Sequence, residues 1–219
     1  CDHCYARVMN ERWGWVKGWG PHGERKRTST ANWKKPYQWD RAAEAAGVRR
    51  RVFSLSLGDW LDNQVPQEWR GDMGNVIDQT PHLDWLLLTK RIQNFRKLSP
   101  WQNPPRNVWL GITCGDQTEY DRDWPILRDI PAAVRFISHE PSLGPLNPLV
   151  APGGNFVLPG WIICGGESGS GARMMEPQWA RDLRDYCAMG GIAFFMKQMT
   201  GKKPIPDDLL VRQFPEPRP

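Results

Sequence analysis

From residue 51 onward, short apolar runs alternate with segments of helical periodicity, and this alternation restricts the fold more than any other feature of the sequence. The apolar runs are the predicted strands, and they lie at 51–57, 84–89, 107–113, 133–138, 160–164 and 192–196. Helical patterns lie between them at 67–79, 91–98, 117–129 and 176–189. Nearly continuous apolar strands that each return after a helix are typical of a parallel sheet covered on both faces. The sequence therefore predicts an α/β fold, a partial or complete TIM-like (β/α) barrel with parallel strands.

Two segments lie outside this pattern. Residues 10–50 have little strand signal and are rich in Gly, Trp and Lys, so they are predicted to form an excursion with one helix at 37–46. Residues 200–219 contain five prolines and are predicted to be an irregular tail. The predicted organisation is a barrel domain over 1–199, carrying the excursion, followed by the tail.

Polar residues follow strand after strand. They are Gly58-Asp59, Thr89-Lys90-Arg91, Thr113-Cys114, His139-Glu140, Gly165-Gly166-Glu167-Ser168 and Lys197-Gln198. Working residues in a barrel lie where the strands end, and buried ionisable groups are costly unless they pair or bind a ligand. A ring of such groups predicts a polar, charged ligand. Each residue alone also has a structural interpretation: a helix cap for Asp59, a solvated loop for Lys90, a hydrogen-bonded core side chain for His139.

The Gly-rich turn at 164–171 has a further property. Glycines after a strand expose backbone N–H groups and let a ligand approach the chain closely. The turn has neither the Gly-Lys-Ser/Thr of a phosphate-binding loop nor the spacing of a dinucleotide fingerprint. It is therefore predicted to face a ligand, with Arg173 as a cationic contact, and a purely structural turn is the alternative.

Charge is concentrated in the first quarter of the chain. Residues 1–51 hold 12 Lys and Arg against five Asp and Glu, a net charge of +7 in a chain whose total is +5. Five of the 13 tryptophans lie there as well. Cations interleaved with aromatic residues suit a nucleic acid, through phosphate attraction and base stacking. The alternative is a solvated loop whose tryptophans pack against the barrel.

The motif Cys1-x-x-Cys4 places two thiolates within reach of one metal centre. A zinc site needs two more ligands with recognisable spacing, and a thioredoxin-type pair needs its motif between a strand and a helix. A cubane iron–sulfur cluster held by three thiolates leaves one iron open, and two of the three could be Cys1 and Cys4. Five scattered cysteines do not suit a disulfide scaffold, so a reducing, cytoplasmic location is expected. No apolar run reaches the ~18 residues of a membrane helix, and no signal peptide pattern is visible.

The order of motifs along the chain resembles a known family. The motifs are Cys-x-x-Cys-Tyr-Ala, Ser-Leu-Gly-Asp-Trp-Leu-Asp, Leu-Leu-Thr-Lys-Arg, Asn-Val-Trp-Leu-Gly-Ile-Thr, Ser-His-Glu-Pro-Ser-Leu-Gly-Pro-Leu, Ile-Cys-Gly-Gly-Glu-Ser-Gly and Phe-Phe-Met-Lys-Gln. Together, from residue 1 to about 200, they resemble the phage-associated three-cysteine-motif proteins, which are similar to radical S-adenosylmethionine enzymes such as spore photoproduct lyase.

The resemblance implies a 4Fe–4S cluster that binds S-adenosylmethionine at its open iron and generates a radical that abstracts hydrogen from a substrate. It implies that Cys1 and Cys4 are the second and third cluster ligands, the first lying before residue 1. His3 would lie near the adenine, and Asp59 would accept from the methionine amino group beside Gly58.

Ribose, carboxylate and substrate contacts are implied for a further set of strand-end residues: Thr89, Lys90, Glu140, Gly165, Gly166 and Glu167. Among these, Lys90, Glu140 and Glu167 are the expected catalytic residues. The expected function is a radical S-adenosylmethionine enzyme that acts on a nucleic acid or modified nucleotide, with nucleic-acid contact through 10–51 and a partner protein. The alternative is a phage-associated nucleic-acid-binding module on a barrel scaffold without catalysis.

Overall fold

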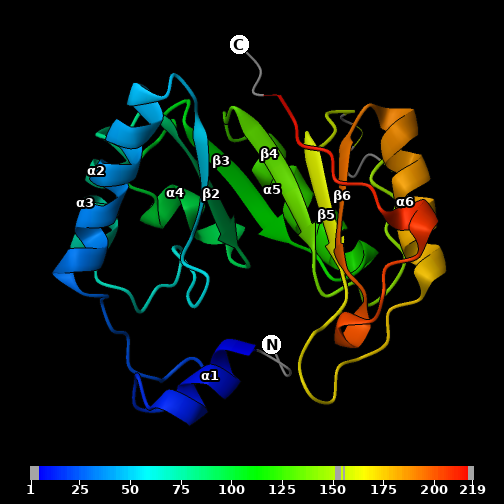
Figure 1. Ribbon diagram of the computed structural model, residues 1–219, viewed down its shortest axis with the longest axis horizontal. Coiled ribbons are helices and arrows are strands. Elements are labelled where there is room, and N and C mark those ends of the chain that lie inside the picture. Colours follow the sequence, from blue (N-terminus) through cyan, green and yellow to red (C-terminus); the bar gives the residue numbers. More distant parts are fainter. Residues whose placement is uncertain (1–4, 151–153, 155, 217–219) are drawn as a thin grey trace. The chain divides into compact units, whose positions relative to one another are not determined.

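The computed structural model describes residues 5–150, 154 and 156–216 and shows an α/β protein (Figure 1). Six strands form one sheet in the order β1-β2-β3-β4-β5-β6. They are β1 (Arg50–Ser54), β2 (Leu83–Thr89), β3 (Val108–Thr113), β4 (Val134–His139), β5 (Trp161–Gly165) and β6 (Ala193–Gln198). The pairs β1–β2, β4–β5 and β5–β6 are parallel. Parallel strands that follow one another in sequence order are the topology of part of a TIM-like barrel, so the predicted fold class is confirmed.

Helices connect most of the strands. They are α1 (Tyr5–Trp13), α2 (Thr30–Ala45), α3 (Gln67–Asp78), α4 (Phe95–Leu98), α5 (Gln117–Arg128) and α6 (Pro177–Gly190). Short 3-10 turns occur at η1 (Ile92–Asn94), η3 (Thr200–Lys202) and η4 (Asp207–Leu209). Local signals fix several ends: Asp116 caps α5 by accepting from the N–H of Glu119, and Gly191 ends α6 with a φ of 63°.

The chain divides into two compact units, one of residues 6–109 and one that contains residues 110–219. In the first unit α2 lies beside α3, and in the second α6 lies against β6 (Figure 1). Strands β2 to β5 are mostly buried, whereas β1 is exposed or half-buried and β6 has two buried residues of six. This division lies inside the region predicted as a single barrel domain, and β3 spans the boundary.

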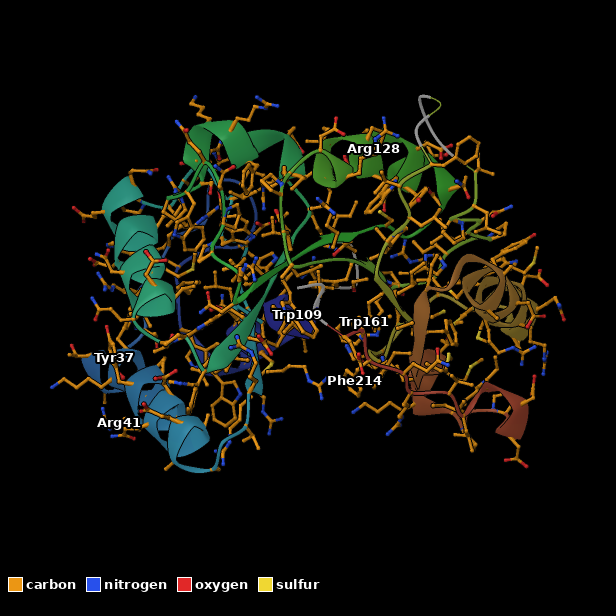
Figure 2. The ribbon with its side chains drawn as sticks, turned by 90° about the horizontal axis from the view of Figure 1, so that it is seen from above. Tyr37, Arg41, Trp109, Arg128, Trp161 and Phe214 are labelled. Atoms are coloured by element: carbon orange, nitrogen blue, oxygen red, sulfur yellow. The ribbon has the colours of Figure 1, made fainter. Side chains whose placement is uncertain are left out.

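The excursion and the tail are more ordered than predicted. Helix α2 begins at Thr30, seven residues before the predicted start, because Ser29 caps it and Pro36 lies inside it. The tail contains η3 and η4 and packs on the last strands. Arg212 bridges to Phe195, and the Trp161 indole N–H donates to the Gln213 carbonyl at 3.0 Å. Phe214 lies 5.4 Å from Trp161 between ring centroids (Figure 2).

Candidate functional site

In the unit of residues 6–109, the loop after β1 presents Asp59, whose carboxylate accepts four hydrogen bonds. Its Oδ1 accepts from the backbone N–H of Leu61 at 3.0 Å and from the hydroxyl of Thr89 at 2.7 Å. Its Oδ2 accepts from the backbone N–H of Lys90 at 2.9 Å and from the guanidinium of Arg91 at 3.2 Å. A carboxylate offers about four acceptor positions, so all of those of Asp59 are used by the chain. The strand ends of β1 and β2 are thereby joined.

In the unit of residues 110–219, Glu140 follows β4 and pairs with Lys197 of β6. The ammonium lies 3.1 Å from Oε1 and 3.2 Å from Oε2, and the hydroxyl of Ser138 donates to Oε2 at 3.3 Å. The Glu140 side chain is only 16% exposed, whereas that of Lys197 is 54% exposed. The ammonium of Lys197 is therefore accessible to solvent, whereas the carboxylate of Glu140 is mostly covered.

Neighbouring groups approach Gly165 and Gly166 closely. A Cβ on Gly165 would lie 2.7 Å from Oε1 of Glu140, and one on Gly166 would lie 2.5 Å from the backbone N of Thr200. The N–H of Gly166 donates to the carbonyl of Gln198 at 3.0 Å, so the chain itself uses this donor. The turn is thus a point where the ends of β4, β5 and β6 approach closely.

Glu167 continues this turn and is the most buried of the strand-end carboxylates, with its side chain 8% exposed. It accepts from the backbone N–H of Arg173 at 2.7 Å and from its Nε at 3.1 Å. The carbonyl of Glu167 accepts from the N–H of Gly201 at 2.8 Å. Arg173 therefore closes the Gly-rich turn, which the sequence predicted to face a ligand.

His139 is a buried structural link between strand ends. Its Nδ1 lies 2.7 Å from the carbonyl oxygen of Cys114, so Nδ1 carries a proton and donates to it. The Nε2 atom of the neutral ring then accepts from the hydroxyl of Ser142 at 2.8 Å. The backbone N–H of Ser142 donates to the carbonyl of Gly165 at 2.9 Å. Of the two interpretations of His139, the structure supports the core side chain that joins the ends of β3, β4 and β5.

The protonation of His139 predicts a pH-dependent stability. Burial lowers the pKa of His139 below its ordinary value of 6.5, and the hydrogen bond to Cys114 offsets this only in part. Below pH 6.5 this histidine binds a proton in the unfolded chain but stays neutral in the folded chain. The free energy of unfolding therefore decreases as the pH falls toward the pKa of the folded state. We expect a loss of up to about 1.4 kcal/mol in the free energy of unfolding per pH unit in that window. Urea titrations at about pH 7.5 and about pH 5.5 measure it.

The matched control for this prediction is His139→Gln, in which the amide can still donate to the Cys114 carbonyl. The variant is less stable than the parent at neutral pH, but its free energy of unfolding changes less between the two pH values. An equal pH dependence in the two proteins would show that other groups cause it.

The thiols among the described residues are buried. Cys114, Cys164 and Cys187 lie in the core, and burial raises the pKa of Cys164 far above its ordinary value and that of Cys187 to about 12. Cys164 and Cys187 are therefore held as thiols, whereas metal ligation requires the thiolate. In residues 5–150, 154 and 156–216, no three His, Cys, Asp or Glu side chains gather into a group that could hold a metal ion.

The structure brings some of the predicted site residues together and leaves others apart. Asp59, Thr89 and the backbone of Lys90 are brought together in one unit, and Glu140 and Gly165 in the other. The side chain of Lys90 lies at the surface, and a Cβ on Gly58 would meet no described atom within 4 Å.

Cys1, His3 and Cys4 lie outside the described residues, so the predicted metal and adenine contacts stay predictions. Sequence reasoning missed the ion pairs that Arg91 and Lys197 form with strand-end carboxylates. The signal was present, because Arg91 and Lys197 lie within two residues of the end of a predicted strand.

A cavity of about 720 Å³ lies at the opposite end of the strands in the unit of residues 110–219. It is lined by the start of β4, the start of β6 and the segment 211–216. Two arginines that line it are already engaged: Arg135 donates to the carbonyl of Ile130 and Arg184 pairs with Asp208. The cavity is therefore separate from the strand-end carboxylates.

Comparison with known proteins gives one family. A family model described as a protein of unknown function (DUF5131) matches residues 1–208, so the chain belongs to this family. Neither the curated proteins nor the solved structures contain a match to the chain. Among the described residues, the helices lack the combination of length and apolar character that crossing a bilayer requires.

Proposed function

We propose that this member of the DUF5131 family is an iron–sulfur-dependent radical S-adenosylmethionine enzyme that works at the carboxyl ends of its strands. The observation that carries the proposal is Asp59, a carboxylate that follows β1 and is only 12% exposed. In the unit of residues 110–219, Glu140 and Glu167 likewise follow their strands and are largely buried. Each carboxylate pairs with an arginine or lysine whose side chain is 38% to 54% exposed, and ionisable groups at the strand ends of such a fold are candidates for function. The motif Cys1-x-x-Cys4 and the motif order along the chain support the choice of cofactor.

Cys1 and Cys4 would ligate the cluster, and a reducing compartment such as the cytoplasm suits it. When bound, the cluster and S-adenosylmethionine would supply a one-electron cleavage of the sulfonium and, through it, abstraction of a hydrogen atom from the substrate. Among the described residues, Asp59 would contribute charge for the methionine amino group.

The fit of Asp59 to this role depends on Arg91. Because all four acceptor positions of Asp59 are used, an incoming ammonium must displace one donor. The Arg91 contact is the longest of the four, at 3.2 Å, and the Arg91 side chain is 38% exposed. Arg91 is thus the donor that can withdraw into water at the smallest cost, which leaves Oδ2 open to the methionine amino group.

This dependence predicts opposite effects for two substitutions. Asp59→Asn removes the charge that the amino group would meet, and loss of a charge-assisted hydrogen bond weakens binding of S-adenosylmethionine by about 10- to 100-fold. Arg91→Ala removes the competing donor, so the affinity stays equal or rises. Equilibrium binding to the full-length protein, reconstituted without oxygen, measures both.

The control for these variants is their free energy of unfolding, since Asp59 also fixes the loop after β1 through Leu61 and Thr89. If Asp59→Asn folds and binds S-adenosylmethionine like the parent, Asp59 only shapes the loop and its proposed role is wrong. If Arg91→Ala binds more weakly, Arg91 itself contacts the ligand.

A second candidate function is a nucleic-acid-binding module without catalysis. It is favoured by the exposure of Trp13, Trp15, Trp19 and Trp39 in the basic excursion, which the alternative of tryptophans packed against the barrel does not explain. This module would bind nucleic acid with a steep salt dependence that survives Cys1→Ala. Loss of binding in that variant would contradict it.

A further inference from the structure

Residues 12–26, here termed the Trp-Lys loop, have a defined conformation. The Asn10 side chain is buried and pairs with both backbone polar groups of Val16, at 3.1 and 2.9 Å. Glu24 and Lys17 are joined by two hydrogen bonds. The backbone N–H of Glu24 donates to the carbonyl of Lys17 at 2.9 Å, and the Glu24 carboxylate accepts from the backbone N–H of Lys17 at 3.1 Å. These bonds close the loop on itself, so its outward side chains are presented by a fixed backbone.

The outward side chains are indoles and cations. Trp13, Trp15 and Trp19 are 58%, 39% and 41% exposed. Arg12 lies 5.1 Å over the Trp13 ring, and the exposed Lys26 donates to the carbonyl of Trp15 at 3.3 Å. Exposed indoles leave much apolar surface in contact with water, so several of them close together in the sequence indicate a binding surface.

Arg25 anchors this loop to the loop after β1. Its Nε and one terminal nitrogen reach Oδ2 of Asp62 at 2.9 and 2.7 Å, and its other terminal nitrogen donates to the carbonyls of Gly20 and Gly23. Both side chains of the ion pair are largely buried, 18% and 11% exposed. Although burial alone would raise the pKa of Asp62, the Gln64 N–H and Arg25 hold it below its ordinary value. The anchor is therefore ionic near neutral pH.

Asp62 lies three residues after Asp59, in the same loop, and its carbonyl accepts from the buried Arg70 at 2.9 Å. The Arg25–Asp62 pair thus joins the Trp-Lys loop to the loop that carries a strand-end carboxylate. A polymer lying on the first loop would run next to the second.

We propose that the Trp-Lys loop binds single-stranded nucleic acid and thereby places it beside the Asp59 loop. Three exposed indoles within seven residues offer stacking faces to bases, and Arg12, Lys17 and Lys26 offer charge to the phosphates. A single strand fits better than two other partners. The base faces of a duplex are stacked inside it, and an acidic protein surface has no bases that could stack on the indoles. This surface goes beyond the cofactor chemistry and does not depend on it.

The test is binding of a fluorescent oligothymidylate of about 16 nucleotides to the full chain, without S-adenosylmethionine, followed by anisotropy and by quenching of Trp fluorescence. We expect Trp15→Ala with Trp19→Ala to weaken binding by about 100-fold, since each stacked base contributes about a factor of ten. Phe156→Ala, at a 79% exposed aromatic side chain outside the loop, is the matched control and binds like the parent.

Arg25→Gln separates the anchor from the contacts. It removes the ionic anchor but none of the three indoles. We expect it to weaken binding by about tenfold, because the loop then adopts more conformations before binding. The number of phosphates contacted stays the same. Its slope of log affinity against log salt therefore matches that of the parent.

Three outcomes would overturn the proposal: no binding of the oligonucleotide, equal loss in the double variant and in Phe156→Ala, or tighter binding of the duplex than of the single strand. Retention of binding in protein that forms no 5′-deoxyadenosine would leave this proposal standing and contradict the proposed function instead.

Discussion

Gly166→Ala is expected to cost about 3 kcal/mol in the free energy of unfolding, because overpacking against backbone cannot be relieved by a rotamer change. The new Cβ would lie 2.5 Å from the backbone N of Thr200 and 2.8 Å from its Cα. The hydroxyl of Thr200 also accepts a hydrogen bond from the backbone N–H of Met175 at 2.9 Å. The ends of β5 and β6 would have to separate. Urea denaturation measures this change as a lower urea concentration at the midpoint of unfolding, with an unchanged dependence of the free energy on urea concentration.

Two neighbouring glycines give matched controls for Gly166→Ala. Gly169→Ala lies in the same turn and meets no described atom within 4 Å, so its effect stays within about 0.5 kcal/mol. Gly165→Ala meets the flexible end of Glu140 at 2.7 Å, so it displaces that carboxylate from Lys197 while the protein still folds. A Gly166→Ala protein as stable as Gly169→Ala would show that the turn is not packed as described.

Cys4→Ala is expected to remove the cluster and all turnover that depends on it. A cluster with a site-open iron needs three thiolates, and loss of one leaves the iron without a complete protein ligand set. After anaerobic reconstitution, we expect the variant to retain less than about a tenth of the iron and sulfide of the parent, since removal of a metal ligand costs at least 10-fold in affinity. Iron and sulfide analysis with visible absorbance measures it.

Cys187→Ala is the matched control for Cys4→Ala. Its thiol is buried in α6, and burial raises its pKa to about 12, so it is not available as a thiolate ligand. This variant keeps the iron content of the parent and loses only some stability. Equal iron in Cys4→Ala and the parent would contradict the assignment of Cys4, and bound zinc in place of iron would favour the zinc alternative.

The sequence was sufficient to predict the strands and most helices, since buried parallel strands have an unmistakable composition. Five of the six strands agree with their predicted ranges to within two residues at each end. For β1 the predicted run 51–57 ends three residues late, because Leu55 has a φ of 58° and turns the chain out of the strand. Leu55 and Leu57 are exposed, so apolar character there does not report a buried strand.

Other features could not be predicted because they depend on partners distant in sequence. The start of α2 was predicted too late because Pro36 usually opens a helix rather than lying within one. Sequence order placed Asp59 and Glu140 at strand ends, but only the structure shows that Arg91 and Lys197 pair with them. Arg25 and Asp62 are likewise 37 positions apart, so the sequence does not show that they pair.

If this protein uses S-adenosylmethionine for radical chemistry as proposed, it forms 5′-deoxyadenosine. The full-length protein is purified without oxygen, reconstituted with iron and sulfide, and given S-adenosylmethionine and a strong one-electron reductant. We predict 5′-deoxyadenosine and methionine in equal amounts from the parent and none from Cys4→Ala. A protein that carries a reducible cluster but yields no 5′-deoxyadenosine, with or without single-stranded nucleic acid, would contradict the claim.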